Sequence, residues 1–111
     1  MMAKILIVDD DKDILRMVEA IIGTTNHSLR TCTDPVIAFE LLKSMHFDLF
    51  ITDANMPKYT GFELVKSLRN EGTLKSLPIA MLTSARDQQN VQKAVEAGVN
   101  GYIVKPIDPV N

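Results

Sequence analysis

Charged and polar residues follow four apolar, strand-like runs of this sequence. Residues 4–8 lead into Asp9, Asp10 and Asp11, residues 48–52 into Asp53, residues 78–82 into Thr83 and Ser84, and residues 101–104 into Lys105. If these runs form parallel strands, all four turns lie along one edge of one sheet. Carboxylates, a hydroxyl and an ammonium then converge from distant parts of the chain, an arrangement that suits a divalent cation and a phosphoryl group.

The acidic residues at this edge need a counter-charge. Asp9, Asp10 and Asp53 would raise one another's pKa values unless a cation neutralised them, and Lys105 supplies one positive charge only. Mg²⁺ takes oxygen ligands and commonly binds one or two carboxylates together with a phosphate. We therefore expect a Mg²⁺ site at these carboxylates.

Each of these residues also has an ordinary structural explanation. The run of three aspartates could cap a helix, and Asp53 could stabilise a turn. Thr83 could cap the helix that follows it, and Lys105 could simply be solvated. The predicted convergence of all four groups at neighbouring strand ends is what favours a functional site.

Helical patterns alternate with the strands, over residues 12–23, 35–45, 62–70 and 87–97. This alternation predicts an α/β fold with a parallel sheet and right-handed crossovers. The run 28–32 is more polar than the others, which predicts an edge strand. We expect a flavodoxin-like, doubly wound sheet of five parallel strands in the order 2-1-3-4-5, with its ligand-binding switch point between strands 1 and 3.

The same patterns predict helix ends and inward faces. Asp34 should cap the second helix with Pro35 at its first position, and Gly23 and Gly98 should end the first and last helices. The expected inward residues are Ile14, Val18, Ile21 and Ile22, then Val36, Ala38, Phe39, Leu41 and Leu42, then Phe62, Leu64, Val65 and Leu68, then Val91, Ala94, Val95 and Ala97. Residues 107–111 resemble the start of another helix, so we expect the last helix of the fold to be missing or truncated.

Composition narrows the class of protein. The 111 residues fit one domain, and the 46% hydrophobic content is enough for a core. The net charge of −2 and the lack of a basic stripe argue against nucleic-acid binding by this domain. The single Cys32, the absence of a membrane-length apolar run and the absence of a signal peptide predict a reduced, cytoplasmic protein without membrane attachment.

Four segments carry a family resemblance. They are ILIVDDD (5–11), DLFITDANMPKYTGFEL (48–64), PIAMLTSA (78–85) and AGVNGYIVKPID (97–108). Together they resemble the receiver domain of bacterial two-component response regulators. The resemblance runs nearly end to end, so we expect residues 1–111 to form a single receiver domain.

The resemblance implies phosphorylation-dependent signalling. Asp53 would be the phosphoacceptor, taking a phosphoryl group from a His of a sensor histidine kinase or a His phosphotransfer protein. Lys105 would pair with the phosphoryl oxygens, and Thr83 would donate its hydroxyl to them. The domain would catalyse its own phosphorylation and dephosphorylation rather than turn over a metabolite, and it would act on an output domain or protein.

The resemblance also implies a set of metal ligands. Asp10 would bind Mg²⁺ directly, Asp9 through water, and Asp53 through its carboxylate. The backbone carbonyl of Asn55 would complete the protein ligands.

Two further groups of residues are expected to transmit the signal. Tyr102 would be a rotamer switch that responds to movement of Thr83 toward the phosphoryl group. Ile14, Leu15 and Met17, at the edges of the apolar band of the first helix, would contact the kinase or phosphotransfer partner.

Two other functions remain open at this point. A pseudo-receiver would bind a partner without taking phosphate, although such a domain should lack one or more of the key residues, and none is missing here. An aspartate-nucleophile phosphatase of the haloacid dehalogenase type would need Thr or Val where this chain has Asp13, and it is usually longer.

Overall fold

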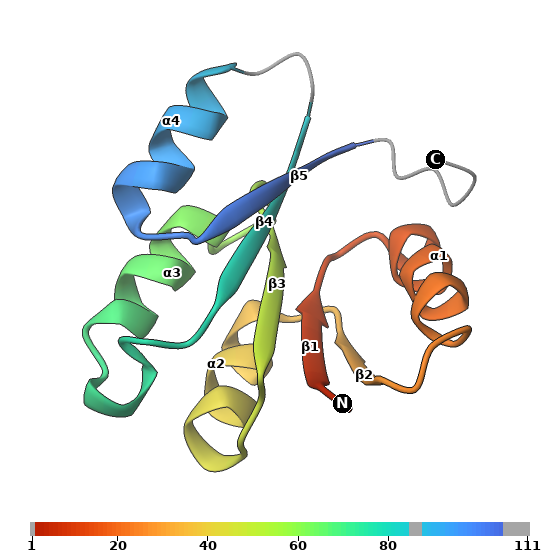
Figure 1. Ribbon diagram of the computed structural model, residues 1–111. Helices are drawn as coiled ribbons and strands as arrows, with labels where there is room; N and C mark the ends of the chain where they lie inside the picture. The colour runs from red at the N-terminus through yellow and green to blue at the C-terminus, as the bar shows by residue number, and fades with distance from the viewer. Residues whose placement is uncertain (1, 85–87, 106–111) are drawn as a thin grey trace.

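The computed structural model describes residues 2–84 and 88–105. Strands and helices alternate along the chain, as the sequence predicts (Figure 1). The elements are β1 (Lys4–Val8), α1 (Lys12–Ile22), β2 (Ser28–Cys32), α2 (Pro35–Ser44), β3 (Leu49–Asp53), α3 (Gly61–Arg69), the 3-10 turn η1 (Gly72–Leu74), β4 (Ile79–Ser84), α4 (Gln88–Ala97) and β5 (Gly101–Lys105).

The five strands form one parallel sheet in the order β2-β1-β3-β4-β5. Both the predicted order and the predicted edge position of β2 are confirmed. The register pairs Val8 with Thr52, Asp53 with Leu82, and Thr83 with Val104. The polar residues that follow the strands therefore lie at the same end of the sheet.

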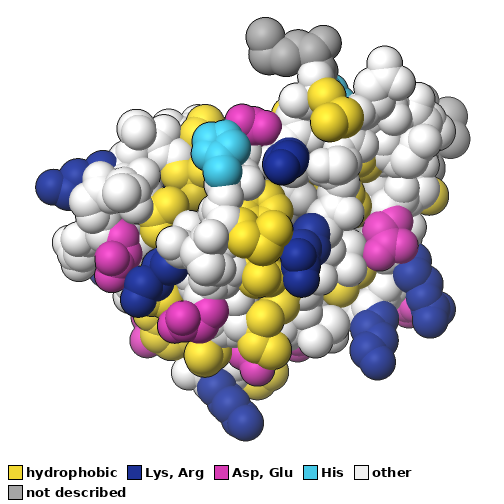
Figure 2. Space-filling model, turned by 90° about the horizontal axis from the view of Figure 1, so that it is seen from below, with side chains coloured by type: hydrophobic (Ala, Val, Ile, Leu, Met, Phe, Trp, Pro, Cys, Tyr) yellow, Lys and Arg dark blue, Asp and Glu magenta, His cyan; other side chains and the backbone are white. Residues whose placement is uncertain are grey.

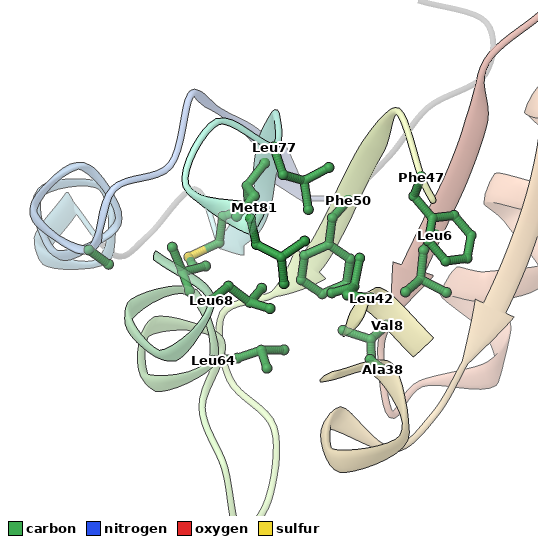
Figure 3. Close-up of a cluster of buried hydrophobic side chains, with 14 of the residues drawn as sticks. Leu6, Val8, Ala38, Leu42, Phe47, Phe50, Leu64, Leu68, Leu77 and Met81 are labelled. Atoms are coloured by element: carbon green, nitrogen blue, oxygen red, sulfur yellow. The ribbon is translucent and has the colours of Figure 1, made fainter. Parts of the chain in front are cut away.

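Helices cover the two faces of the sheet unequally. Helices α2, α3 and α4 lie on one face and α1 on the other (Figure 1). The larger core cluster joins residues such as Leu6, Phe50 and Met81 of the sheet to Leu42 of α2 and Leu64 of α3 (Figure 3). A smaller cluster packs α1 against the opposite face through Leu15 and Val18. The fold is therefore doubly wound, with its core built from aliphatic side chains and Phe.

Local hydrogen bonds explain where the helices begin. Asp11 caps α1 by accepting from the Asp13 amide at 2.9 Å, and Asp34 caps α2 by accepting from the Val36 amide at 2.9 Å. Helix α3 starts with a capping box between Thr60 and Glu63. These caps satisfy amides that have no partner within the helix.

Two predicted helix faces need correction. Val36 and Val95 are each 62% exposed rather than inward, whereas Ile14 is half-buried and packs against the smaller core cluster as predicted. The buried residues of α2 and α4 are three or four positions apart, as Ala94 and Ala97 are, so they lie on one side of each helix. Val36 and Val95 lie about 100° or more around the helix axis from these residues and therefore point away from the core. The side chain of Val91 lies outside the described part of the structure. The predicted helix at 107–111 also lies outside the described residues.

The described helices include none that is long and apolar enough to span a membrane. The face at the amino ends of the strands, seen from below in Figure 2, carries dispersed charged side chains around an apolar centre. A groove on this side lies between the end of α2, the start of β3 and the segment before β4. The acidic cluster lies at the opposite, carboxyl ends of the strands.

Candidate functional site

Three carboxylates meet at the carboxyl end of the sheet. Asp9 and Asp10 follow β1, and Asp53 is the last residue of the neighbouring β3. One oxygen from each lies within 4.8 Å of the others. The predicted convergence of these residues at the switch point between β1 and β3 is thus present in the folded chain.

Lys105 enters this cluster from the far edge of the sheet. Its Nζ donates a hydrogen bond to Oδ1 of Asp53 at 3.0 Å and forms an ion pair with Oδ2 of Asp9 at 3.2 Å. The side chain reaches over β4 to do so, because β4 separates β5 from β3. One ammonium is therefore shared between two buried carboxylates.

Asp9 has no exposed surface. Its Oδ1 accepts a hydrogen bond from the amide of Asp11 at 2.9 Å, and its own amide donates to the Cys32 carbonyl at 3.1 Å. Burial raises the pKa of Asp9, with a further rise from the charge of Asp53, and these effects outweigh the hydrogen bond from Asp11 and the charge of Lys105. The carboxylate is fixed in place but is incompletely neutralised.

Asp53 lies in a similar environment. Burial raises its pKa, and the hydrogen bond and charge of Lys105 and the amide of Asn55 compensate only in part. Burial alone would lower the pKa of Lys105, but its contacts with Asp53 and Asp9 outweigh burial and raise it. The lysine therefore stays charged, and its single positive charge offsets only part of the negative charge of the carboxylates.

This donor set fits a hard divalent cation. It offers three carboxylates and one ammonium, so its charge is unbalanced, and carboxylate oxygens are the ligands that Mg²⁺ prefers. Asp10 is exposed, whereas Asp9 and Asp53 are buried, so the cluster opens to solvent on one side. The residues present therefore fit the metal that the sequence predicted.

Thr83 lies next to this cluster in β4, and its side chain is almost fully buried, with 1% of its surface exposed. Among the residues that the structure describes, its hydroxyl has no hydrogen-bond partner. A buried hydroxyl without a partner is unusual and unfavourable, because it loses its hydrogen bonds to water without replacement. Such a group is suited to donate to a ligand that enters the site.

Gly61 lies directly against the end of β3, a close contact that was not predicted from the sequence. A Cβ at this position would lie 2.1 Å from the carbonyl oxygen of Asp53, and its amide donates to the Ala54 carbonyl at 3.0 Å. Helix α3 thus begins directly against the end of β3. The only sequence signal was a glycine directly after Thr60, which does not distinguish close approach from an ordinary helix start.

The other predicted site residues lie farther out. Asn55 is exposed in the loop after β3, and its backbone amide lowers the pKa of Asp53. Tyr102 is 49% exposed on β5, two residues before the register partner of Thr83. Neither observation tests the role expected for these residues.

The predicted docking residues on α1 do not share one surface. Leu15 is 5% exposed and packs in the core cluster with Val18 and Ile7, so it is not available to a partner. Its expected docking role is withdrawn for that reason. Ile14 and Met17 are half-buried and keep accessible surface.

The order of the sheet and the acidic cluster at its switch point define a flavodoxin-like α/β domain. The sequence matches the response regulator receiver domain family over residues 5–111. It is 39% identical over 104 residues to the chemotaxis protein CheY-3 of Vibrio cholerae, covering 93% of this chain and 80% of that protein. It is 40% identical over 106 residues to the chemotaxis protein CheY of Pseudomonas aeruginosa, covering 93% and 84%.

A solved structure agrees with these relatives. The chemotaxis response regulator CheY4 of Vibrio cholerae superposes with a TM-score of 0.91 at 36% identity, over 99% of this chain and 92% of that one. The chain therefore belongs to the response-regulator receiver family of two-component signalling, and the resemblance seen in the sequence is confirmed.

Proposed function

We propose that this domain accepts a phosphoryl group on Asp53 and thereby switches an output surface. The donor would be a phosphohistidine of a sensor histidine kinase or a His phosphotransfer protein. The whole chain, residues 1–111, would act as one receiver unit in the cytoplasm. The output would be an attached domain or a separate protein, and it would not be nucleic acid bound directly by this domain.

One observation carries the proposal. The carboxylate of Asp53 lies in a buried cluster with a shared ammonium at 3.0 Å, and the hydroxyl of Thr83 on the neighbouring strand has no partner within the described part of the chain. If Asp53 had only a structural role, the unsatisfied hydroxyl of Thr83 beside it would serve no purpose. A phosphoryl group on Asp53 would supply acceptor oxygens for both Lys105 and Thr83.

The reaction can be written with this chain's own groups. A carboxylate oxygen of Asp53 would attack the phosphorus, forming an acyl phosphate as the phosphorus–nitrogen bond to the donor histidine breaks. The bonding electrons would leave with the imidazole. Lys105 would transfer its contact from the Asp53 carboxylate to the phosphoryl oxygens, and charge stabilisation of this kind dominates phosphoryl transfer.

Asp9, Asp10, Asp53 and the backbone carbonyl of Asn55 would hold Mg²⁺ in this site. When bound, the ion would supply positive charge against the phosphoryl oxygens. The chain's contribution is to keep the carboxylates close together in a partly buried cluster whose negative charge Lys105 compensates only in part.

The signal would leave the site through β4 and β5. Thr83 would move toward the phosphoryl group, and Tyr102 would respond by changing rotamer. Tyr102, Ile103 and Val104 are large, exposed side chains on the edge strand, so a change there would alter a surface that a partner can contact. Ile14 and Met17 remain as proposed contacts for the kinase or phosphotransfer protein.

Intact-mass measurement after incubation with acetyl phosphate tests the proposal. The protein should gain one phosphoryl group in the presence of Mg²⁺ and none when Mg²⁺ is chelated. Asp53→Asn should abolish the gain. Asp13→Asn, which changes an exposed aspartate in the same part of the chain, should leave it intact.

Absence of phosphorylation in a folded protein, with Mg²⁺ binding retained, would contradict the proposal and favour the pseudo-receiver function. Continuous release of phosphate from small phosphoesters would instead favour the phosphatase.

A further inference from the structure

A second groove lies beside the phosphoacceptor loop, between α3 and α4. These two helices lie next to each other on the same face of the sheet (Figure 1). The groove has a volume of about 450 Å³, and its lining residues are Asn55, Thr60, Phe62, Lys66, Lys93 and Glu96. None of the three carboxylates of the acidic cluster lines it, and Asn55 is the one lining residue that is also a proposed metal ligand.

Two lysines face this groove from different helices. Lys66 of α3 and Lys93 of α4 are both exposed, and within the described part of the chain neither forms an ion pair. Their positive charges are therefore available to a ligand.

The nearby acidic residues are engaged elsewhere. Glu63, one turn before Lys66, accepts from the Thr60 amide at 3.1 Å and the Thr60 hydroxyl at 3.0 Å in the capping box of α3. Glu96 accepts from the Gln92 side chain on its own helix at 3.4 Å. Among the described residues, the groove thus holds two cations and one carboxylate that is turned along α4.

Phe62 provides an apolar surface in the same groove. Its ring is half-buried and packs against the larger core cluster, so its position is fixed while part of it remains accessible. A purely inorganic anion would leave this surface uncovered. A ligand that combines carboxylates with an apolar side chain would use both features.

We propose that the α3–α4 groove docks an acidic segment of a partner protein. Two carboxylates of the segment pair with Lys66 and Lys93, and an apolar side chain between them packs on Phe62. The charge of the groove selects an acidic ligand over a basic one, and the two lysines on separate helices set the spacing of its carboxylates.

Docking at this groove is coupled to the phosphoacceptor, a step that rests on the proposed function. Asn55 and Thr60 line the groove and belong to the loop that leaves Asp53. Gly61, at the end of that loop, lies against the Asp53 carbonyl. A phosphoryl group that shifts this loop alters the groove, and by thermodynamic reciprocity the docked segment alters phosphorylation equally.

The test is a heteronuclear NMR titration of the unphosphorylated protein with a capped peptide in which leucine is flanked by Asp and Glu. A counterpart with Asn and Gln in their place is the ligand control. We expect saturable shifts at the amides of Phe62, Lys66 and Lys93. The double variant Lys66→Gln/Lys93→Gln should bind about tenfold more weakly, as expected for two exposed ion pairs.

The matched protein control is Lys12→Gln/Lys75→Gln, which removes the same charge from two other exposed lysines. Equal weakening by both double variants, or shifts spread over all surface lysines, would overturn the proposal. Displacement of the peptide by inorganic phosphate at equal concentration would do so as well, because the apolar contact would then contribute nothing.

Failure of docking is separable from failure of the proposed function. The titration uses unphosphorylated protein, so it does not require Asp53 to accept phosphate. A second titration in the presence of acetyl phosphate and Mg²⁺ should change the peptide affinity, and Asp53→Asn should remove that change. An affinity that is identical with and without a phosphoryl group, verified by mass, would overturn the coupling.

Discussion

The ammonium of Lys105 donates a hydrogen bond to the Asp53 carboxylate across 3.0 Å, joining residues that are 52 positions apart in the chain. The same ammonium lies 3.2 Å from Asp9. This lysine is the only cation that contacts the acidic cluster among the described residues, so it determines how much of the carboxylate charge is compensated before any metal binds.

Replacing Lys105 with Met should therefore destabilise the protein. Two buried carboxylates would lose their shared counter-ion, and removing one member of a buried pair is strongly unfavourable. Because the lysine side chain is 25% exposed, we expect a loss of about 2 kcal/mol in the free energy of unfolding, measured by urea denaturation without Mg²⁺. Lys75→Met, at an exposed position, should change it by less than about 0.5 kcal/mol. Equal effects of the two substitutions would contradict the role given to Lys105.

The raised pKa values of Asp9 and Asp53 predict an unusual pH dependence. A carboxyl whose pKa is higher in the folded than in the unfolded chain holds its proton more tightly when folded, so its protonation favours folding. Without Mg²⁺, the stability should rise as the pH falls from neutral through the folded pKa values, down to the unfolded value of about 3.9. The pKa of Asp48 is lowered, chiefly by the hydrogen bond from the Lys4 amide. Protonation of Asp48 therefore reduces the stability, but only when the pH falls below the ordinary pKa of an aspartate.

Thermal denaturation over this pH range, without Mg²⁺, measures the effect. Asp53→Asn should flatten the rise, because it removes one of the two responsible carboxyls. A wild-type stability that falls steadily over the whole range would show that these carboxyls are fully compensated by Lys105.

Replacing Gly61 with Ala should disturb the site without touching its polar groups. The added Cβ would lie 2.1 Å from the Asp53 carbonyl oxygen, and the nearby atoms are backbone that cannot move aside cheaply. We expect a loss of about 2–3 kcal/mol in stability, typical of severe overpacking, together with slower phosphorylation by acetyl phosphate.

Gly72→Ala is the matched control, since a Cβ there meets nothing within 4 Å. It should leave both stability and phosphorylation nearly unchanged. If Gly61→Ala behaved like Gly72→Ala, the close contact between α3 and β3 would not be needed to position Asp53.

Replacing Thr83 with Val should stabilise the unmodified protein. The buried hydroxyl has no partner among residues 2–84 and 88–105, so removing it relieves a desolvation penalty at nearly constant shape, and we expect a gain of about 1 kcal/mol. Thr52→Val is the contrasting change, because the buried Thr52 hydroxyl donates to the Asp53 carbonyl at 3.1 Å. It should lose about 1 kcal/mol. Chemical denaturation of both variants without phosphodonor measures these changes in the free energy of unfolding. A loss of stability for Thr83→Val would mean that the Thr83 hydroxyl already has a hydrogen-bond partner.

Arg69 should be a large contributor to stability at the other end of the sheet. Its guanidinium donates five hydrogen bonds, to the carbonyls of Gly98, Leu74, Lys75 and Leu77 and to the side chain of Asn100. Burial lowers its pKa, and no carboxylate compensates among the described residues. Arg69→Met should cost about 3 kcal/mol, because it leaves several carbonyls without a partner.

Calorimetry can compare this variant with Arg16→Met, which removes an exposed arginine whose contact with Asp13 is 3.9 Å long. The second change should be nearly neutral. Similar transition temperatures for the two variants would show that water replaces Arg69 as a donor to these carbonyls.

The sequence by itself determined the order of the elements and the end of the sheet at which the polar residues gather. Alternating strands and helices with short connections leave few topologies open, and parallel strands place all their carboxyl ends on one edge. For that reason the positions of Asp9, Asp53, Thr83 and Lys105 could be predicted without coordinates. Helix caps such as Asp34 were predictable as well, because they depend only on neighbouring residues.

The tertiary structure alone decided which groups meet and how well each is satisfied. Whether Val36 faces the core, whether Leu15 is exposed and which carboxylates share Lys105 all depend on how distant segments pack, and a pattern along the chain does not contain those distances. The fit of Gly61 against Asp53 and the five hydrogen bonds of Arg69 have the same origin. Local sequence determines which segments form strands and helices, but the close packing of distant segments determines which side chains are in contact.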